Sequence, residues 1–184
     1  MKKLSLALIA LSLSLVSIGQ TAKKTTKTKK TTPKTEKKVE KTETVAKVEE
    51  TAGLKWYTDL NEAQAAAKKS GKPLMLFFTG SDWCGWCKRL DAEVFSKPEF
   101  KTWSDKEVIM LVVDFPRASI LSEAQKTQNM KLQQQFAIRG YPTIVFANVS
   151  GESDQMALAE KGRTGYLAGG PATWIANANT LIGK

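Results

Sequence analysis

Residues 73–90 read PLMLFFTGSDWCGWCKRL and contain both cysteines of the chain, Cys84 and Cys87. The first part, Pro73–Gly80, is a continuous apolar run after a turn, which predicts a strand buried on both faces. From Trp86 onward the apolar residues have helical spacing, which predicts a helix. The two thiols therefore lie, in this prediction, where a buried strand ends and a helix begins.

That position favours a reactive thiol at Cys84. The start of a helix carries the positive end of the helix dipole and unpaired N–H groups, and both stabilise a thiolate. Cys87 follows one turn later on the same side, so it can form a disulfide with Cys84 with little backbone movement. We therefore predict Cys84 as the attacking thiol and Cys87 as the resolving thiol. Lys88 and Arg89 add positive potential, which solvation weakens.

Other uses of a cysteine pair have less support. The chain has no histidine, and a structural zinc site usually takes four Cys or His ligands, so we expect no metal site. A Cys–His hydrolase is excluded for the same reason. The five methionines form no cluster beside the pair that would favour copper. A purely structural disulfide stays open because exported proteins use them routinely, although closing so short a loop stabilises little.

Residues 139–143, RGYPT, form a second motif. The bond Tyr141–Pro142 lies between a predicted helix and a predicted strand, and it is a candidate for a cis peptide. If it is cis and faces the cysteines, the backbone of Tyr141 can pair with an extended substrate segment near the disulfide. Taken alone, the string is typical of an ordinary turn from a loop into a strand.

Around these motifs, strands and helices alternate along residues 54–184, about 130 residues, the size of one domain with its own core. This alternation predicts an α/β fold with a central mixed sheet flanked by helices. We expect strands at 54–58, 73–80, 107–115, 143–147 and 155–163, and helices over 59–70, from 84, at 98–105 as a short turn, over 123–136 and from 171.

Residues 1–19 have the pattern of a signal peptide. Lys2 and Lys3 precede the apolar run Leu4–Ile18, and small residues place a cleavage site near Gly19–Gln20. At about 15 residues the run is short for a membrane span, which needs roughly 20, although an uncleaved anchor is an alternative. No cysteine is near for lipid attachment. We expect export to the periplasm or beyond the cell.

Residues 20–53 carry most of the remaining basic excess, with ten lysines and five glutamates. The tract is rich in Lys and Thr and lacks aromatic residues, so it predicts a disordered linker, either a plain spacer or a polycation that touches an anionic surface. The domain after it is nearly balanced, with 16 basic and 13 acidic residues. Nucleic-acid binding, which needs a basic patch on a fold, is therefore not expected.

Together these features resemble the thioredoxin superfamily. The matching parts are the strand 73–80, the motif Trp83–Lys88, and Gly140–Thr143 before a strand. The resemblance covers residues 54–184 and implies a thioredoxin fold. It also implies a nucleophilic Cys84, a resolving Cys87 and a cis-proline at Pro142. We expect substrate contacts from residues beside the pair: Trp83, Trp86, Tyr141 and Pro142.

Within the superfamily, the chain resembles the exported bacterial thioredoxin-like or disulfide-reductase-like branch. The long stretch between Val113 and Gly140 also fits that branch better than a compact thioredoxin. It departs from thioredoxin at Trp86, where thioredoxin has proline, and at Phe78, where thioredoxin has a buried acid that accepts the proton of the resolving thiol. Asp82 is near, but we expect it on an exposed loop and assign it no such role. The linker is no part of the family fold. The departures at Trp86 and Phe78 leave the direction and rate of electron transfer open.

The sequence thus predicts an exported, monomeric thiol–disulfide oxidoreductase, favoured as a reductase, that needs no cofactor beyond its cysteine pair. Its partners would be exported proteins with cysteines and a further redox partner, such as a membrane electron donor. Membrane contact is expected only through an uncleaved signal segment or the basic linker. The alternative is a non-catalytic binding or chaperone-like module whose cysteines form a locked disulfide.

Overall fold

The computed structural model describes residues 49–51, 53–151 and 156–184. These residues belong to one compact unit that spans 43–184. The predicted signal peptide, and the predicted linker as far as residue 48, lie outside the described residues. Within the described part, no helix has both the length and the apolar character that a membrane crossing requires.

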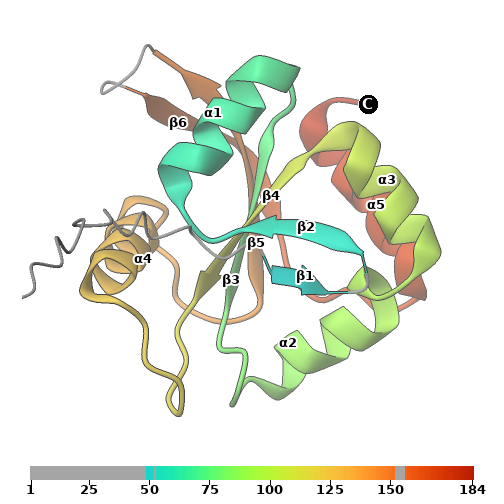
Figure 1. Cartoon of the computed structure of the whole chain (residues 1–184). Coiled ribbons are helices and arrows are strands. Elements are labelled where there is room, and N and C mark those ends of the chain that lie inside the picture. The colour runs from blue at the N-terminus through green and yellow to red at the C-terminus, as the bar shows by residue number, and fades with distance from the viewer. Residues whose placement is uncertain (1–48, 52, 152–155) are drawn as a thin grey trace, which may run out of the picture. The chain divides into compact units, whose positions relative to one another are not determined.

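The centre of the fold is a mixed sheet of six strands in the order β1-β2-β4-β3-β5-β6 (Figure 1). Strands β2 and β3 both pair with β4 in parallel, and all other neighbours are antiparallel. The strands are β1 (Glu49–Thr51), β2 (Leu54–Tyr57), β3 (Leu74–Thr79), β4 (Ile109–Asp114), β5 (Thr143–Ser150) and β6 (Ala157–Thr164).

Helices cover both faces of the sheet, as predicted. They are α1 (Leu60–Ser70), α2 (Gly85–Leu90), which continues into the π-helix η1 (Asp91–Phe95), α3 (Pro98–Glu107), α4 (Glu123–Gln135) and α5 (Gly170–Ile182). Local signals start several of them. The Asp59 side chain accepts from the Glu62 N–H at 3.0 Å to cap α1, and Pro98 occupies the first turn of α3, where its missing N–H costs nothing.

Strand β3 divides the core into two clusters. Its side chains alternate, so that Leu76 and Phe78 pack with α1 and α4 while Met75 and Phe77 pack with α2, η1, α3 and α5. Every residue of β3 is buried, which confirms the prediction of a strand covered on both faces. Phe78 meets Phe136, the residue just after α4, at 6.2 Å between ring centroids, and both cysteines belong to the opposite cluster.

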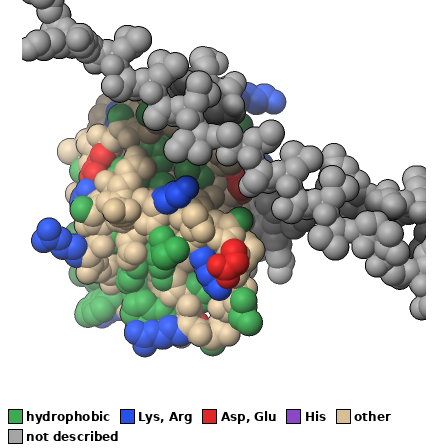
Figure 2. Space-filling view, turned by 90° about the vertical axis from the view of Figure 1, so that its left-hand side faces the viewer, with side chains coloured by type: hydrophobic (Ala, Val, Ile, Leu, Met, Phe, Trp, Pro, Cys, Tyr) green, Lys and Arg blue, Asp and Glu red, His purple; other side chains and the backbone are tan. Residues whose placement is uncertain are grey.

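The face of α1 and α4, on the left of Figure 1, is seen directly in Figure 2. Its Lys and Arg side chains lie apart from one another among apolar and neutral groups, and acidic side chains lie between them. A solvated surface of mixed charge is what the near-balanced composition of the domain predicts for this face.

The structure differs from the expected elements in three places. Strand β1 was not predicted and falls within the predicted linker, because Glu-Glu-Thr gives no apolar alternation; only its pairing with β2 defines it. Helix α3 is a full helix of 10 residues rather than a short turn. Strand β5 runs three residues beyond Ala147 to Ser150, since β6 pairs with it along that extension.

Candidate active site

The two cysteines lie at the start of α2, just after the carboxyl end of β3, where the sequence placed them. They form a disulfide with an S–S distance of 2.03 Å and a Cα–Cα distance of 5.2 Å. Cys84 is the N-cap of α2, and its sulfur accepts the Cys87 N–H at 3.2 Å. In the dithiol form this hydrogen bond and the helix start both favour a thiolate on Cys84. The geometry therefore suits Cys84 as the attacking thiol.

A tight turn from Gly80 to Trp83 delivers the chain to Cys84. The Cys84 N–H donates to the Gly80 carbonyl at 2.8 Å. The Trp83 ring lies over Gly80 so closely that a Cβ there would be 2.3 Å from the ring. Glycine at position 80 is therefore required by the placement of Trp83.

The same turn is tied to the loop after β4. The Asp82 carboxylate accepts the N–H groups of Arg117 and Ala118 at 2.9 and 2.5 Å. These bonds, led by that of Ala118, hold the pKa of Asp82 below its usual 3.8. The Trp83 indole N–H donates to the Phe115 carbonyl at 2.8 Å. Asp82 thus organises the loop, because its carboxylate accepts the backbone N–H groups of Arg117 and Ala118.

The second sequence motif lies against the first. The bond Tyr141–Pro142 is cis, as anticipated. The Tyr141 ring meets Trp83 edge-on at 5.7 Å and Phe115 at 5.5 Å between centroids. Its hydroxyl accepts from Gln133 at 2.6 Å, and burial raises the pKa of Tyr141. The fold therefore brings the proline loop beside the cysteine turn.

On the other side of the pair, Trp86 is 55% exposed and packs on Tyr166 at 5.1 Å. The Arg89 guanidinium stacks against both rings and donates to Glu93 at 2.8 Å. The Tyr166 hydroxyl also donates to Glu93, at 2.6 Å, and these two hydrogen bonds lower the pKa of Glu93. Sequence reasoning missed Tyr166, because it lies in a loop far along the chain and reaches the site only through the fold.

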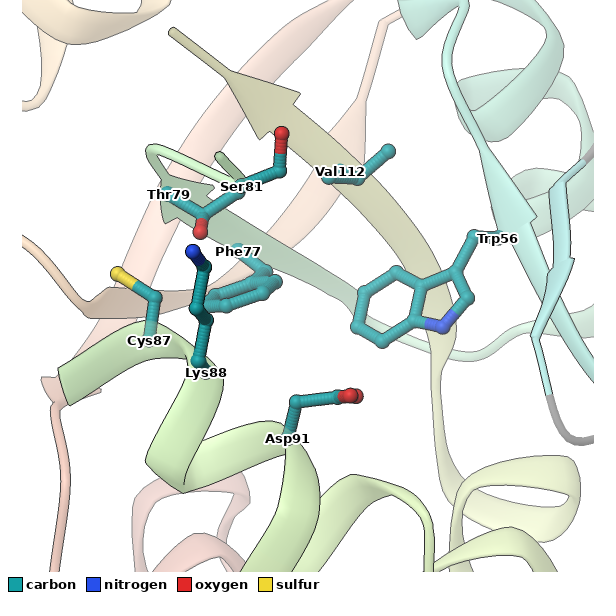
Figure 3. A pocket seen from close by; sticks show the side chains of 8 residues that line it. All are labelled: Trp56, Phe77, Thr79, Ser81, Cys87, Lys88, Asp91 and Val112. Carbon is teal, nitrogen blue, oxygen red and sulfur yellow. The ribbon is translucent and has the colours of Figure 1, made fainter. Parts of the chain in front are cut away.

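Behind the disulfide lies a hollow of about 180 Å³ (Figure 3). It is lined by Trp56, Phe77, Thr79, Ser81, Cys87, Lys88, Asp91 and Val112. Asp91 is the acidic residue of this lining, and loss of water contact raises its pKa. Spacing could have pointed to it, because Asp91 follows Cys87 by four residues and so shares its helix face.

Phe78, at the position of the thioredoxin acid, has an apolar ring that cannot accept a proton, and this ring lies in the opposite core cluster. Within residues 49–51, 53–151 and 156–184, no group of three or more His, Cys, Asp or Glu side chains is placed to hold a metal.

Residues 55–148 match the protein family described as Thioredoxin-like. The chain belongs to this family. Over 131 residues it is 34% identical to "Disulfide bond reductase DsbH" of Chlamydia pneumoniae, an alignment that covers 71% of the chain and 74% of that protein. A solved structure of "DsbH Oxidoreductase" superimposes with a TM-score of 0.63 at 29% identity, and covers 81% of this chain and 95% of its own.

Two further thioredoxin-like proteins extend the comparison. The solution structure of a thioredoxin from Thermus thermophilus, at 20% identity and a TM-score of 0.51, covers 68% of this chain and 85% of its own, and it supports the fold alone. "Thiol:disulfide interchange protein DsbD" of Salmonella typhimurium is 34% identical over 94 residues, which are 51% of the chain and 15% of that protein. The chain therefore corresponds to a small part of DsbD.

These findings confirm the predicted thioredoxin fold and the redox-active cysteine pair, Cys84 and Cys87. The protein is a thioredoxin-like thiol–disulfide oxidoreductase, so the locked, non-catalytic module is not favoured. Substrate contacts by Trp83, Trp86, Tyr141 and Pro142 remain predictions. The fold brings the two motifs that contain these residues beside the cysteine pair. The exposed fractions are 37% for Trp83 and 55% for Trp86.

Proposed function

We propose that this thioredoxin-like protein reduces disulfides in exported proteins. The observation that carries the proposed direction is the 34% identity, over about three quarters of its length, to a protein named as a disulfide bond reductase. The hydrogen bond from the Cys87 N–H to the Cys84 sulfur supports the chemistry, because it stabilises the thiolate that begins the reaction.

In the proposed reaction the Cys84 thiolate attacks one sulfur of a substrate disulfide. A mixed disulfide forms, and the second substrate sulfur leaves as a thiolate that takes up a proton. Cys87 then loses its proton and attacks the Cys84 sulfur, which releases the first substrate sulfur as a thiol. The substrate gains two electrons and two protons, and the protein is left with the Cys84–Cys87 disulfide.

Asp91 is the proposed acceptor for the Cys87 proton. The hollow between them is large enough to hold several waters, each of which takes about 30 Å³ in the liquid. In Figure 3 the Asp91 side chain points away from the Cys87 sulfur, so the proton would pass through water in the hollow. This arrangement replaces the strand acid of thioredoxin by a carboxylate on the helix.

The export proposal rests on the signal-peptide pattern of residues 1–19. An oxidising compartment does not return the protein to its dithiol form, so a reductase there needs a partner that supplies electrons, such as a membrane donor. Exported proteins with cysteines would be its substrates. Mass spectrometry of the mature protein tests cleavage: a chain that starts near Gln20 supports it, and an intact Met1 contradicts it.

The direction of electron flow is tested by the reduction potential of the pair, measured by equilibration with glutathione or dithiothreitol. A value near the roughly −270 mV of thioredoxin supports a reductase, and one near −120 mV means an oxidant. A disulfide with a potential below about −300 mV is of the structural kind, and such a result would overturn the catalytic proposal.

Substrates are tested by trapping with Cys87→Ala, which cannot resolve the mixed disulfide. Exported proteins should accumulate in mixed-disulfide complexes that a reducing agent separates. The matched control is Cys84→Ala, which lacks the attacking thiol and should trap nothing. Equal trapping by both variants would contradict the assigned order of the two thiols.

A further inference from the structure

The two sides of the cysteine pair differ in how their arginines are neutralised. On the Trp86 side, Arg89 forms an ion pair with Glu93 at 2.8 Å. On the Trp83 side, the exposed Arg117 guanidinium lies 4.3 Å from the centre of the Trp83 ring. Within the described residues, no carboxylate lies within ion-pair distance of that guanidinium. Among the described residues, Arg117 therefore has no carboxylate partner, and its cation stacks on Trp83, the residue before Cys84.

The position of this cation is held by the loop that carries it. We call residues 115–121 the lip loop. Asp82 binds its backbone through the N–H groups of Arg117 and Ala118, and the Trp83 indole binds the Phe115 carbonyl. These bonds hold both the backbone of Arg117 and the ring of Trp83. The Arg117 side chain therefore loses little conformational entropy when it binds a ligand.

The acids near the lip loop are already engaged by donors. Asp82 accepts backbone N–H groups of the loop itself, and Asp114 accepts the N–H and hydroxyl of Ser81 at 2.9 and 2.6 Å. The Lys88 amine, bound to the Asp82 carbonyl at 2.7 Å, adds a further positive charge beside the turn. The positive charges of Arg117 and Lys88 on this side of the site therefore favour the binding of a negatively charged group.

We propose that the Trp83 side of the site selects partner segments that carry Asp or Glu close to the disulfide cysteine, with Arg117 binding that carboxylate. A guanidinium stacked on an indole keeps its N–H edge free, and that edge matches a carboxylate in two parallel hydrogen bonds. Ile120, 91% exposed in the same loop, offers an apolar contact for the rest of the segment. This inference rests on the proposed function, since it concerns the substrates of the same cysteine pair.

The test compares three disulfide peptides that are identical except for Glu, Gln or Lys beside the cysteine. The reduced protein should reduce the Glu peptide roughly threefold faster than the Gln peptide, the size expected of one exposed ion pair, and the Lys peptide more slowly. The Glu-to-Gln ratio should shrink as salt is added. In Arg117→Gln the ratio should fall to about one.

Lys106→Gln is the matched control. Lys106 lies at the end of α3, before the amino end of β4, and so at the opposite edge of the sheet from Cys84. The Lys106→Gln variant loses one positive charge, as Arg117→Gln does, and it should keep the wild-type Glu-to-Gln ratio. Because each ratio uses the Gln peptide as its own reference, a smaller folded fraction of any variant does not alter it.

The outcomes separate the two proposals. Equal rates for the Glu and Gln peptides with the wild-type protein overturn the acidic selection and leave the reductase intact. An equal drop of the ratio in Lys106→Gln and Arg117→Gln shows an effect of net charge, and it overturns the assignment to Arg117. If no peptide is reduced at all, the proposed function itself fails.

Discussion

Cys87 must lose a proton before it can attack, and at the residue scale the question is which group takes it. The ring of Phe78 cannot, and it lies on the other side of the sheet. Asp91 lines the same hollow as Cys87 and follows it on the helix. This residue is the structural basis of the first prediction.

We predict that Asp91→Asn slows release of substrate from the mixed disulfide, on the order of a hundredfold, the lower end of general acid–base contributions. Because the pKa of Asp91 is raised, its carboxylate is lost at a higher pH than that of an ordinary aspartate. Release by the wild-type protein should slow as the pH falls through that raised pKa. Stopped-flow single-turnover measurements across pH check both effects.

The control for this prediction is Glu62→Gln, which removes an exposed carboxylate from α1 on the other face of the sheet. It should leave release unchanged. If Asp91→Asn keeps both the rate and the pH dependence of the wild type, the proton leaves Cys87 by another route.

A second prediction concerns Asp82. Its lowered pKa means that its contribution to the folded loop is present above the usual 3.8 and is lost as the pH falls through the still lower folded value. Asp82→Asn should therefore speed hydrogen exchange at the amides of Arg117 and Ala118 on the order of tenfold at neutral pH. Exchange measured by NMR checks this, and unchanged protection of both amides would contradict the assigned contacts.

At the element scale, the connection from β3 through the turn to α2 was predictable because three independent signals coincide there. These are a buried apolar run, a glycine before the cysteines and helical spacing after them. Helix α4 was predictable as well, and a capping box of Ser122 and Gln125 marks its start. Strand β1 was not, since an edge strand of three polar residues is defined by its partner and not by its own pattern.

The turn itself gives a third prediction. In Gly80→Ala the new Cβ would overlap the Trp83 ring, which cannot move freely because the Phe115 carbonyl and Tyr141 hold it. Such overpacking costs about 1–3 kcal/mol. Thermal unfolding should show the loss, with a change in indole fluorescence.

Gly140→Ala serves as the comparison for this prediction. A Cβ at Gly140 would have no neighbour within 4 Å, and its φ is not in the left-handed region. The substitution should leave stability unchanged or slightly raised. If the two variants unfold at the same temperature, the contact between Gly80 and Trp83 is not what constrains position 80.

At the scale of the whole molecule, the family, the fold and the cysteine pair could be predicted from the sequence, but the surroundings of the pair could not. Asp91 was missed although its spacing from Cys87 could have pointed to it, whereas Tyr166 and Arg117 were missed because each acquires its role from a partner that is brought near by folding. Tyr166 needs Trp86 and Glu93, and Arg117 needs the ring of Trp83. No local pattern reports such contacts.

The linker prediction is also tested at this scale. The described unit has its own two core clusters, and residues 20–48 carry no aromatic residue. Removal of residues 20–48 should therefore leave both the melting temperature and the reduction potential of the pair unchanged. Calorimetry and redox titration check this, and a lower melting temperature would mean that the tract packs on the domain.

The burial of the two cysteines has a consequence for how fast the reduced protein is oxidised. In the disulfide form Cys84 is 5% exposed and Cys87 2% exposed, and the reactivity of a thiol depends on its access to solvent. We therefore expect dissolved oxygen and small disulfides to oxidise the reduced pair slowly, and a partner whose chain fits the site to react faster.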